Sequence, residues 1–200
     1  MRTVVDMATA RNKLLEAAMV VLQASPEQRL NITVLNKALF YLDLYALRDH
    51  GEVVTGHDYI ALPQGPVLDS YPSLLVRPLT ESALAEQIEE GKAKPIRVVR
   101  RLGKFSHLSA SELALAERIG SSFGSLTSMM VSDFSHRNPG WQLAFRDFDP
   151  KKPGHKINML IALQQLDEPD ESDSEWMSAP LDEQTMAACN RAQFATLVWE

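Results

Sequence analysis

Apolar residues recur at helical spacing in two segments near the N-terminus. The first runs from Thr9 to Ala24 and stops at Ser25-Pro26. Before the second, Asn31 or Thr33 can cap a helix, and Gly51 follows it in the position that favours a left-handed residue. Its apolar stripe repeats every three or four residues and consists of Leu35, Leu39, Leu42 and Ala46. The pattern therefore predicts two amphipathic helices.

The rhythm changes after Gly51. Asp58–Leu62 has strand character and ends at Pro63-Gln64-Gly65-Pro66, a rigid corner that we expect to aim a following helix. We predict that this helix covers Val67–Leu75 and that another covers Ser82–Glu90. Ile96–Arg100 is the second strand candidate.

Two more helices are predicted towards the C-terminal half. Ser109 and Glu112 have the spacing of a capping box, which starts a helix over Leu113–Phe123. A shorter helix covers Met129–Ser135, and Asn138-Pro139 breaks it. The predicted fold class is α+β and predominantly α-helical, a compact helical body with a small antiparallel β-sheet or hairpin.

Charge divides the chain into three parts. The 200 residues contain 20 Lys and Arg against 26 Asp and Glu, a net charge of −6, and six of the acids lie between Asp167 and Glu175. We therefore expect a body over residues 1–166, an acidic linker over 167–175 and a C-terminal apolar helical segment over 176–200. That last segment either docks on the body or is offered to a partner.

Catalytic motifs are absent from the sequence. It contains no P-loop, no Gly-x-Gly-x-x-Gly and no Gly-x-Ser-x-Gly. No two of its five histidines lie three or four residues apart, and its one cysteine, Cys189, allows no intrachain disulfide. We therefore expect no catalytic, cofactor-binding or metal-binding residues and a protein that is not an enzyme.

No targeting or membrane-spanning segment is apparent. The longest apolar stretch, Leu14–Leu22, contains Glu16 and is too short to cross a bilayer. We expect a cytoplasmic protein without a membrane partner.

Two blocks of residues carry a resemblance to a known family. The first is a helix with Leu35, Lys37, Leu39, Phe40, Tyr41, Asp43 and Leu47, followed by Thr55-Gly56, Tyr59, Pro63, Gly65 and Pro66. The second contains Leu108-Ser109, Ile119, Phe123-Gly124, Ser135-His136, Pro139 and Trp141. Over roughly residues 9 to 160 the chain resembles the Panacea-domain family, also called SocA-like antitoxins and once grouped as phage-associated. It departs from the family pattern at 137–140, which lacks the usual acid before the tryptophan.

The resemblance implies a domain over residues 1–166 that belongs to a toxin–antitoxin system. Such a domain neutralises a cognate toxin by direct protein–protein binding. The candidate partner-binding or motif residues are Lys37, Tyr41, Asp43, Tyr45, Thr55, Gly56, Tyr59, Pro63, Gly65, Pro66, His136 and Trp141. Each also has a structural interpretation, such as a buried network between Asp43 and a tyrosine or histidine, or a core position for Trp141.

Two alternatives stay open at this point. The resemblance also implies a proteolytic adaptor that delivers the toxin to a Clp-type protease. The other alternative is a DNA-binding transcriptional regulator, because Leu126–Trp141 has a rough helix-turn-helix pattern and Lys92–Lys104 contains six bases and no acid. The first 166 residues carry a balance of only +2, so nucleic acid is not the expected partner. A solvated strand pair is the plainer interpretation of the basic run.

Overall fold

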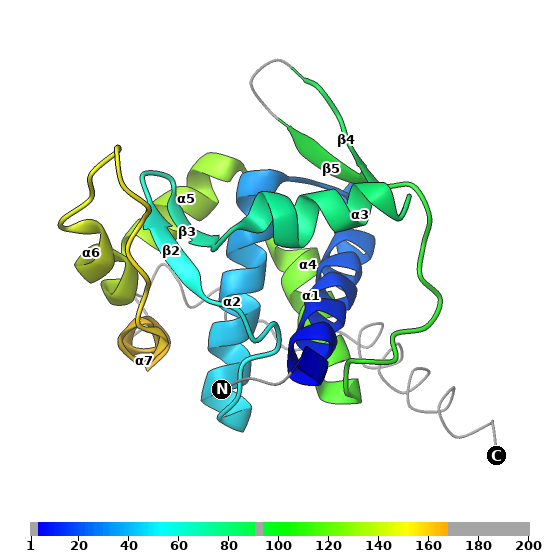
Figure 1. The fold of residues 1–200 in the computed structure, drawn as a ribbon, viewed down its shortest axis with the longest axis horizontal. Coiled ribbons are helices and arrows are strands. Elements are labelled where there is room, and N and C mark those ends of the chain that lie inside the picture. The colour runs from blue at the N-terminus through cyan, green and yellow to red at the C-terminus, as the bar shows by residue number, and fades with distance from the viewer. Residues whose placement is uncertain (1–3, 91–93, 168–200) are drawn as a thin grey trace.

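The computed structural model describes residues 4–90 and 94–167, and long helices form the centre of this part of the chain. Helices α1 (Val4–Ala24), α2 (Ile32–His50) and α4 (Ala110–Gly124) pack against one another (Figure 1). Helix α1 begins before the predicted start at Thr9. Fully buried side chains fill the space between the helices, among them Leu14, Leu35, Leu39 and Phe123. The main hydrophobic core therefore lies along these three helices.

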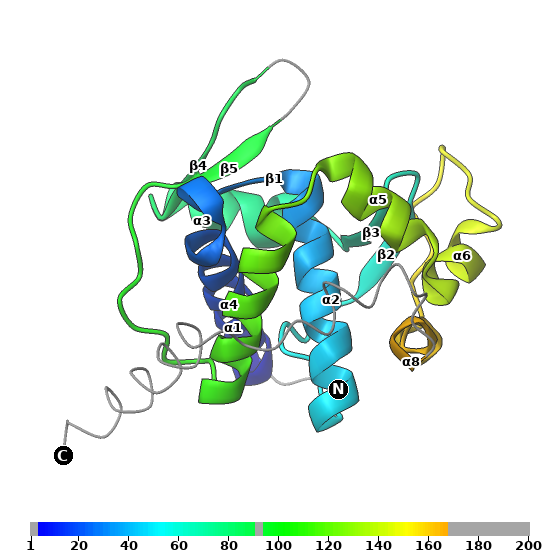
Figure 2. The same cartoon turned by 180° about the vertical axis from the view of Figure 1, so that it is seen from behind.

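Helix α2 lies inside the molecule rather than on its surface. It has α1 and α4 on one side and β3 and α5 on the other (Figures 1 and 2). Every residue from Val34 to Ala46 is buried, polar ones included. Its ends are as predicted: the Asn31 side chain accepts the backbone N–H of Thr33 at 3.0 Å, and Gly51 adopts a φ of 76°. A helix enclosed on all sides must satisfy its polar side chains internally.

An antiparallel sheet of order β1-β5-β4 joins Arg29–Asn31, Pro95–Val98 and Ala85–Gln87. Strand β1 follows a short 3-10 turn, Pro26–Gln28. The helix predicted over Ser82–Glu90 is wrong, because the chain turns at Ala83, where φ is 53°, and then pairs with β5. Glu86 forms an ion pair with Arg97 across the strands, so part of the basic run is a strand pair with solvent-facing charges.

A β-hairpin made of β2 (Tyr59–Leu62) and β3 (Gly65–Leu68) packs on the other side of α2. The helix predicted over Val67–Leu75 is wrong in its first residues. Gly65, with a φ of 104°, turns the chain back into a strand, and the helical turns come later, at Pro72–Val76 and in α3 (Arg77–Glu81). The corner therefore closes a hairpin and does not aim a helix.

Shorter helices complete the described part of the chain. They are α5 (Ser128–His136), α6 (Pro139–Phe145), α7 (Met159–Ala162) and α8 (Gln164–Asp167). Asn138 caps α6 with Pro139 as its first residue, so this dipeptide starts a helix as well as ending one. The capping box of Ser109 and Glu112 is confirmed. Backbone bonds from Ile157 to Tyr59 and from Ala61 to His155 tie the segment before α7 to β2.

The fold class is α+β and predominantly helical, as predicted. The predicted boundary at residue 166 falls within α8, and the acidic linker and C-terminal segment lie outside the described residues except for Asp167. Lys92 of the basic run lies outside them as well. In residues 4–90 and 94–167, no helix combines the length and the apolar character that crossing a membrane requires.

Candidate functional site

The carboxylate of Asp43 is the centre of a buried polar network. Its Oδ1 accepts the backbone N–H groups of Val54 at 2.7 Å and Thr55 at 2.8 Å. Its Oδ2 accepts the hydroxyl groups of Tyr59, at 2.8 Å, and of Thr55. The contact between Asp43 and a tyrosine, proposed from the sequence as a structural network, is therefore confirmed. It joins α2 to the loop before β2 and to β2 itself.

Burial determines the electrostatics of this network. It raises the pKa of Asp43 to about 6, against the opposing effect of the hydrogen bonds from Thr55, Tyr59 and Val54. Burial and the neighbouring carboxylate also raise the pKa of Tyr59 well above its ordinary value. Because Asp43, Thr55 and Tyr59 are buried and hydrogen-bonded to one another, they can influence a partner only by supporting the residues at the surface.

The two candidate tyrosines of α2 are also buried. The hydroxyl group of Tyr41 donates to Gln165 Oε1 at 2.9 Å. The guanidinium groups of Arg48 and Arg118 lie 4.9 Å and 5.8 Å from the centre of the Tyr45 ring. These tyrosines, like Gly56 with its φ of 67°, are part of the structure that supports the surface, which we call the frame.

The other candidate residues meet at the turn of the β2–β3 hairpin. Gly65 lies so close to α2 and α5 that a methyl group on it would overlap Ser135 Oγ and approach Lys37 Cε to 2.8 Å. The ring of His136 stacks on the ring of Trp141, with 4.4 Å between their centres. Trp141 is buried, as its core interpretation predicts, and its indole N–H donates to the Leu62 carbonyl at 3.1 Å. Residues Pro63–Pro66 are thus held between two helices and a tryptophan.

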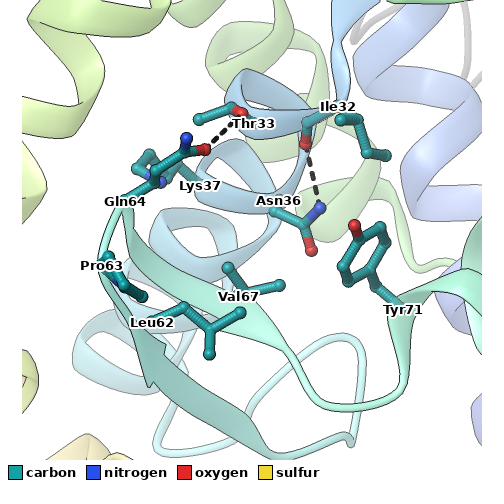
Figure 3. Close-up of a pocket in the computed structure, with 9 residues that line it drawn as sticks. All are labelled: Ile32, Thr33, Asn36, Lys37, Leu62, Pro63, Gln64, Val67 and Tyr71. Atoms are coloured by element: carbon teal, nitrogen blue, oxygen red, sulfur yellow. Dashed lines mark hydrogen bonds between the residues drawn. The ribbon is translucent and has the colours of Figure 1, made fainter. Parts of the chain in front are cut away.

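The surface around this turn is hollowed on both sides of Gln64. The first hollow, about 270 Å³, lies between the start of α2 and the hairpin and is lined by Ile32, Thr33, Asn36, Lys37, Leu62, Pro63, Gln64, Val67 and Tyr71 (Figure 3). We call it the Lys37 hollow. The second, about 480 Å³, is lined by Asn31, Ile32, Thr33, Gln64, Lys94, Ser128, Met129 and Ser132, and we call it the Met129 hollow. Together they form the Gln64 surface.

Weak contacts hold Gln64 between the two hollows. Its side-chain oxygen accepts the Thr33 hydroxyl at 3.4 Å, and its backbone carbonyl accepts the Ser132 hydroxyl at 3.3 Å. Its side chain is exposed to solvent. It can therefore rearrange at small cost when another molecule approaches.

Lys37 is an unusual residue for the wall of a hollow. It is completely buried, and its Nζ has no hydrogen-bond partner among the described residues. Burial lowers its pKa to about 8. The pKa of His136 is lowered by its own burial and by the charge of Lys37, while Asp133 and the Pro63 carbonyl act in the opposite direction. Lys37 and His136 thus interact electrostatically at this end of the Gln64 surface, with the carboxylate of Asp133 nearby.

One structural network was missed by the sequence analysis. Gln165 accepts Tyr41 and Asn138 Nδ2 through its Oε1, each at 2.9 Å, and donates to the Phe134 carbonyl at 3.1 Å. Asn138 Nδ2 also donates to the Ala162 carbonyl. No signal in the sequence predicts a contact between residues as distant as Tyr41 and Gln165. The network fixes α8 against α2 and the α5–α6 turn.

Replacing Gln165 with alanine should lower the free energy of unfolding by about 2 kcal/mol, because the Tyr41 hydroxyl, the Asn138 amide and the Phe134 carbonyl each lose a buried hydrogen bond. Urea denaturation followed by circular dichroism measures this. The matched control is Gln164→Ala, in the neighbouring exposed residue, which should change stability by less than about 0.5 kcal/mol. Equal effects of the two changes would show that the network does not stabilise the protein.

Within residues 4–90 and 94–167 no three His, Cys, Asp or Glu side chains are grouped so that they could hold a metal ion.

Comparison with known proteins assigns the chain to a family. No curated protein and no solved structure matches the chain. The family model described as "Antitoxin SocA-like, Panacea domain" matches residues 35–142, more than half of the chain, including Lys37, the hairpin and α5. The chain therefore belongs to the SocA-like antitoxins with a Panacea domain, the family that the sequence motifs indicate.

Proposed function

We propose that this antitoxin neutralises a cognate toxin by direct protein–protein contact and that the contact is made on the Gln64 surface. The observation that carries the proposal is the position of two adjoining hollows around the turn of the Pro63–Pro66 motif, lined mostly by residues of the family-matched part of the chain. The Lys37 hollow has mainly apolar walls with a few polar groups, which is typical of a binding site, and the Met129 hollow adds mainly polar side chains.

The frame behind this surface supports the proposal. The Asp43 network and the stack of His136 on Trp141 fix both ends of the β2–β3 hairpin against α2, α5 and α6. A rigid frame lowers the conformational entropy that is lost on binding. The motif thus has a structural role, since its buried residues position the exposed ones.

Exposed methionines on α5 provide the second argument. Met129, at 72% exposure, lines its hollow, and Met130 beside it is 52% exposed. Methionine is flexible and polarisable, and it suits surfaces that adapt to a protein partner. The apolar area of these two side chains extends the Gln64 surface along α5.

The proposal is tested with the growth-inhibiting product of a reading frame adjacent to the gene for this chain. Co-expression should restore growth, and the two proteins should co-purify with an affinity that Met129→Asp lowers at least about tenfold. Leu160→Asp is the matched control, because Leu160 is 70% exposed on α7 and lines neither hollow. Equal loss of affinity in both variants, or none in either, would contradict the proposed surface.

The half-life of the toxin distinguishes a blocking antitoxin from a proteolytic adaptor. We expect the toxin to be at least as long-lived in cells that contain this chain as in cells without it. A shorter half-life that depends on a Clp-type protease would replace the blocking mechanism with delivery, and the binding surface would remain as proposed.

A further inference from the structure

The unpartnered amine of Lys37 has a chemical consequence for the partner. A buried ammonium group without a counter-ion or a hydrogen-bond acceptor is costly, since it has lost its water and gained nothing in return. Lys37 Nζ is in this state within the described part of the chain. A negatively charged group that entered the Lys37 hollow would remove this cost.

The surroundings of Lys37 favour an anion. The hollow lies beside the first turn of α2, where Ile32 and Thr33 contribute to its wall and the helix dipole is positive. His136, whose pKa responds to the charge of Lys37, adds no negative charge. None of the residues that line the hollow is acidic. A carboxylate in this position would therefore meet no repulsion from the wall.

The wall of the hollow limits what can carry the anion. Most of the side chains around Lys37 are apolar or aromatic: Ile32, Leu62, Pro63, Val67 and Tyr71 (Figure 3). The amide of Asn36 is already used, because its oxygen accepts the N–H of Leu68 at 3.1 Å and its nitrogen donates to Ile32 at 2.9 Å. One lysine and the weakly held Gln64 can serve a singly charged carboxylate, whereas a phosphate requires more donors.

We propose that the Lys37 hollow binds the carboxylate of a glutamate or aspartate side chain of the toxin, whose carbon stem packs on the apolar wall. This inference rests on the proposed function and names the chemistry of its anchor. Because Lys37 Nζ is closed off from solvent beside the hairpin turn, the weakly held Gln64 side chain moves aside, the carboxylate pairs with Lys37, and the Gln64 amide N–H turns towards its second oxygen. The pair is shielded from water by the two proteins, where a charge-assisted bond is strong.

The first test compares Lys37→Met with the wild-type chain against the toxin that the wild type binds. Methionine has a similar length and no charge, so it should leave thermal stability equal or higher, while the affinity for the toxin falls more than about tenfold. Lys104→Met is the matched control, because Lys104 is exposed and lines neither hollow, and it should change affinity less than about threefold. A Lys37→Met variant that is folded and binds as well as the wild type would overturn the proposal.

A double-mutant cycle identifies the toxin residue. Each glutamate of the toxin is changed to glutamine and each aspartate to asparagine, in combination with wild-type and Lys37→Met chains. One of these changes should weaken binding to the wild type and have almost no further effect on Lys37→Met. If the effects of all acidic residues add to that of Lys37→Met, the lysine does not pair with the toxin and the proposal is wrong.

A small probe tests the hollow without the toxin, so that a failure of the proposed function can be distinguished from a failure of this inference. N-acetylglutamate α-amide, added to the full-length chain at millimolar concentration, should shift the NMR signals of Thr33 and Asn36, and the glutamine analogue should not. Equal shifts with both compounds would overturn the proposal. Larger shifts by inorganic phosphate would show a phosphate site, which also overturns it. Binding of the probe only after the six acids of Asp167–Glu175 are neutralised would assign the hollow to the chain's own acidic run instead.

Discussion

Replacing Asp43 with alanine should lower the free energy of unfolding by at least about 3 kcal/mol. The change leaves four buried donors without their acceptor: the N–H groups of Val54 and Thr55 and the hydroxyl groups of Thr55 and Tyr59. It also separates α2 from the loop that leads into β2. Urea denaturation at neutral pH measures the loss, and a decrease below about 1 kcal/mol would show that the network does not join these elements.

Asp43→Asn is the matched variant, since it keeps the shape and one acceptor oxygen, and its amide can donate to the oxygens of Thr55 and Tyr59. The two proteins should differ in their pH dependence. Because the pKa of Asp43 in the folded protein is about 6 rather than the ordinary 3.8, the folded state binds more protons than the unfolded state between these values. The part of the stability that depends on protonation of Asp43 is therefore complete below pH 3.8 and is lost as the pH rises through 6, whereas the hydrogen bonds that the carboxylate accepts remain at neutral pH.

The difference in unfolding free energy between wild type and Asp43→Asn should thus shift against the wild type by about 3 kcal/mol across this interval. The pKa values of other carboxylates also change on folding, including those of Glu16 and Glu112, where burial raises the pKa and hydrogen bonds together lower it by more. They are common to both proteins and cancel in the comparison. A difference that stays constant with pH, or moves in favour of the wild type, would contradict the raised pKa.

Local signals explain which elements could be predicted. The cap at Asn31, the left-handed Gly51 and the capping box of Ser109 and Glu112 each depend on residues within one helical turn of a helix end. Those features are decided by nearest neighbours, so a sequence reveals them. The strand candidates Asp58–Leu62 and Ile96–Arg100, which contain β-branched and aromatic residues, correspond to the observed strands Tyr59–Leu62 and Pro95–Val98.

The two wrong helices show where local propensity fails. Ser82–Glu90 is rich in Ala, Leu, Glu and Gln, which favour helices, but pairing with β5 satisfies its backbone and buries Ala85. At Pro66 the prediction assumed a strand end, because proline is rare inside strands. Here Pro66 lies opposite Ala61 inside the hairpin, and the turn is set by Gly65. In both segments, pairing with another strand determined the secondary structure.

The candidate site was predictable in its frame but not in its surface. Lys37, Asp43 and His136 belong to the motif, and a buried role for Asp43 follows from its place on an apolar helix. The hollows could not be predicted, because Thr33, Gln64 and Met129 come from three separate segments that only packing brings together. That Lys37 Nζ finds no hydrogen-bond partner in residues 4–90 and 94–167 also depends on every neighbour that surrounds it.

Replacing Gly65 with alanine should cost about 3 kcal/mol of stability and abolish binding to the toxin. Two effects add: a φ of 104° disfavours any side chain, and the new methyl group would overlap Ser135 Oγ and crowd Lys37 Cε. Gly51→Ala measures the backbone effect alone, because Gly51 has a φ of 76° and nothing lies within 4 Å of the added methyl group. This variant should cost only about 1 kcal/mol. Adding Ser135→Ala to Gly65→Ala removes the overlapping oxygen and should recover part of the loss. If Gly65→Ala and Gly51→Ala are equally mild, the hairpin turn is not held against α2 and α5, and the Gln64 surface loses its rigid support.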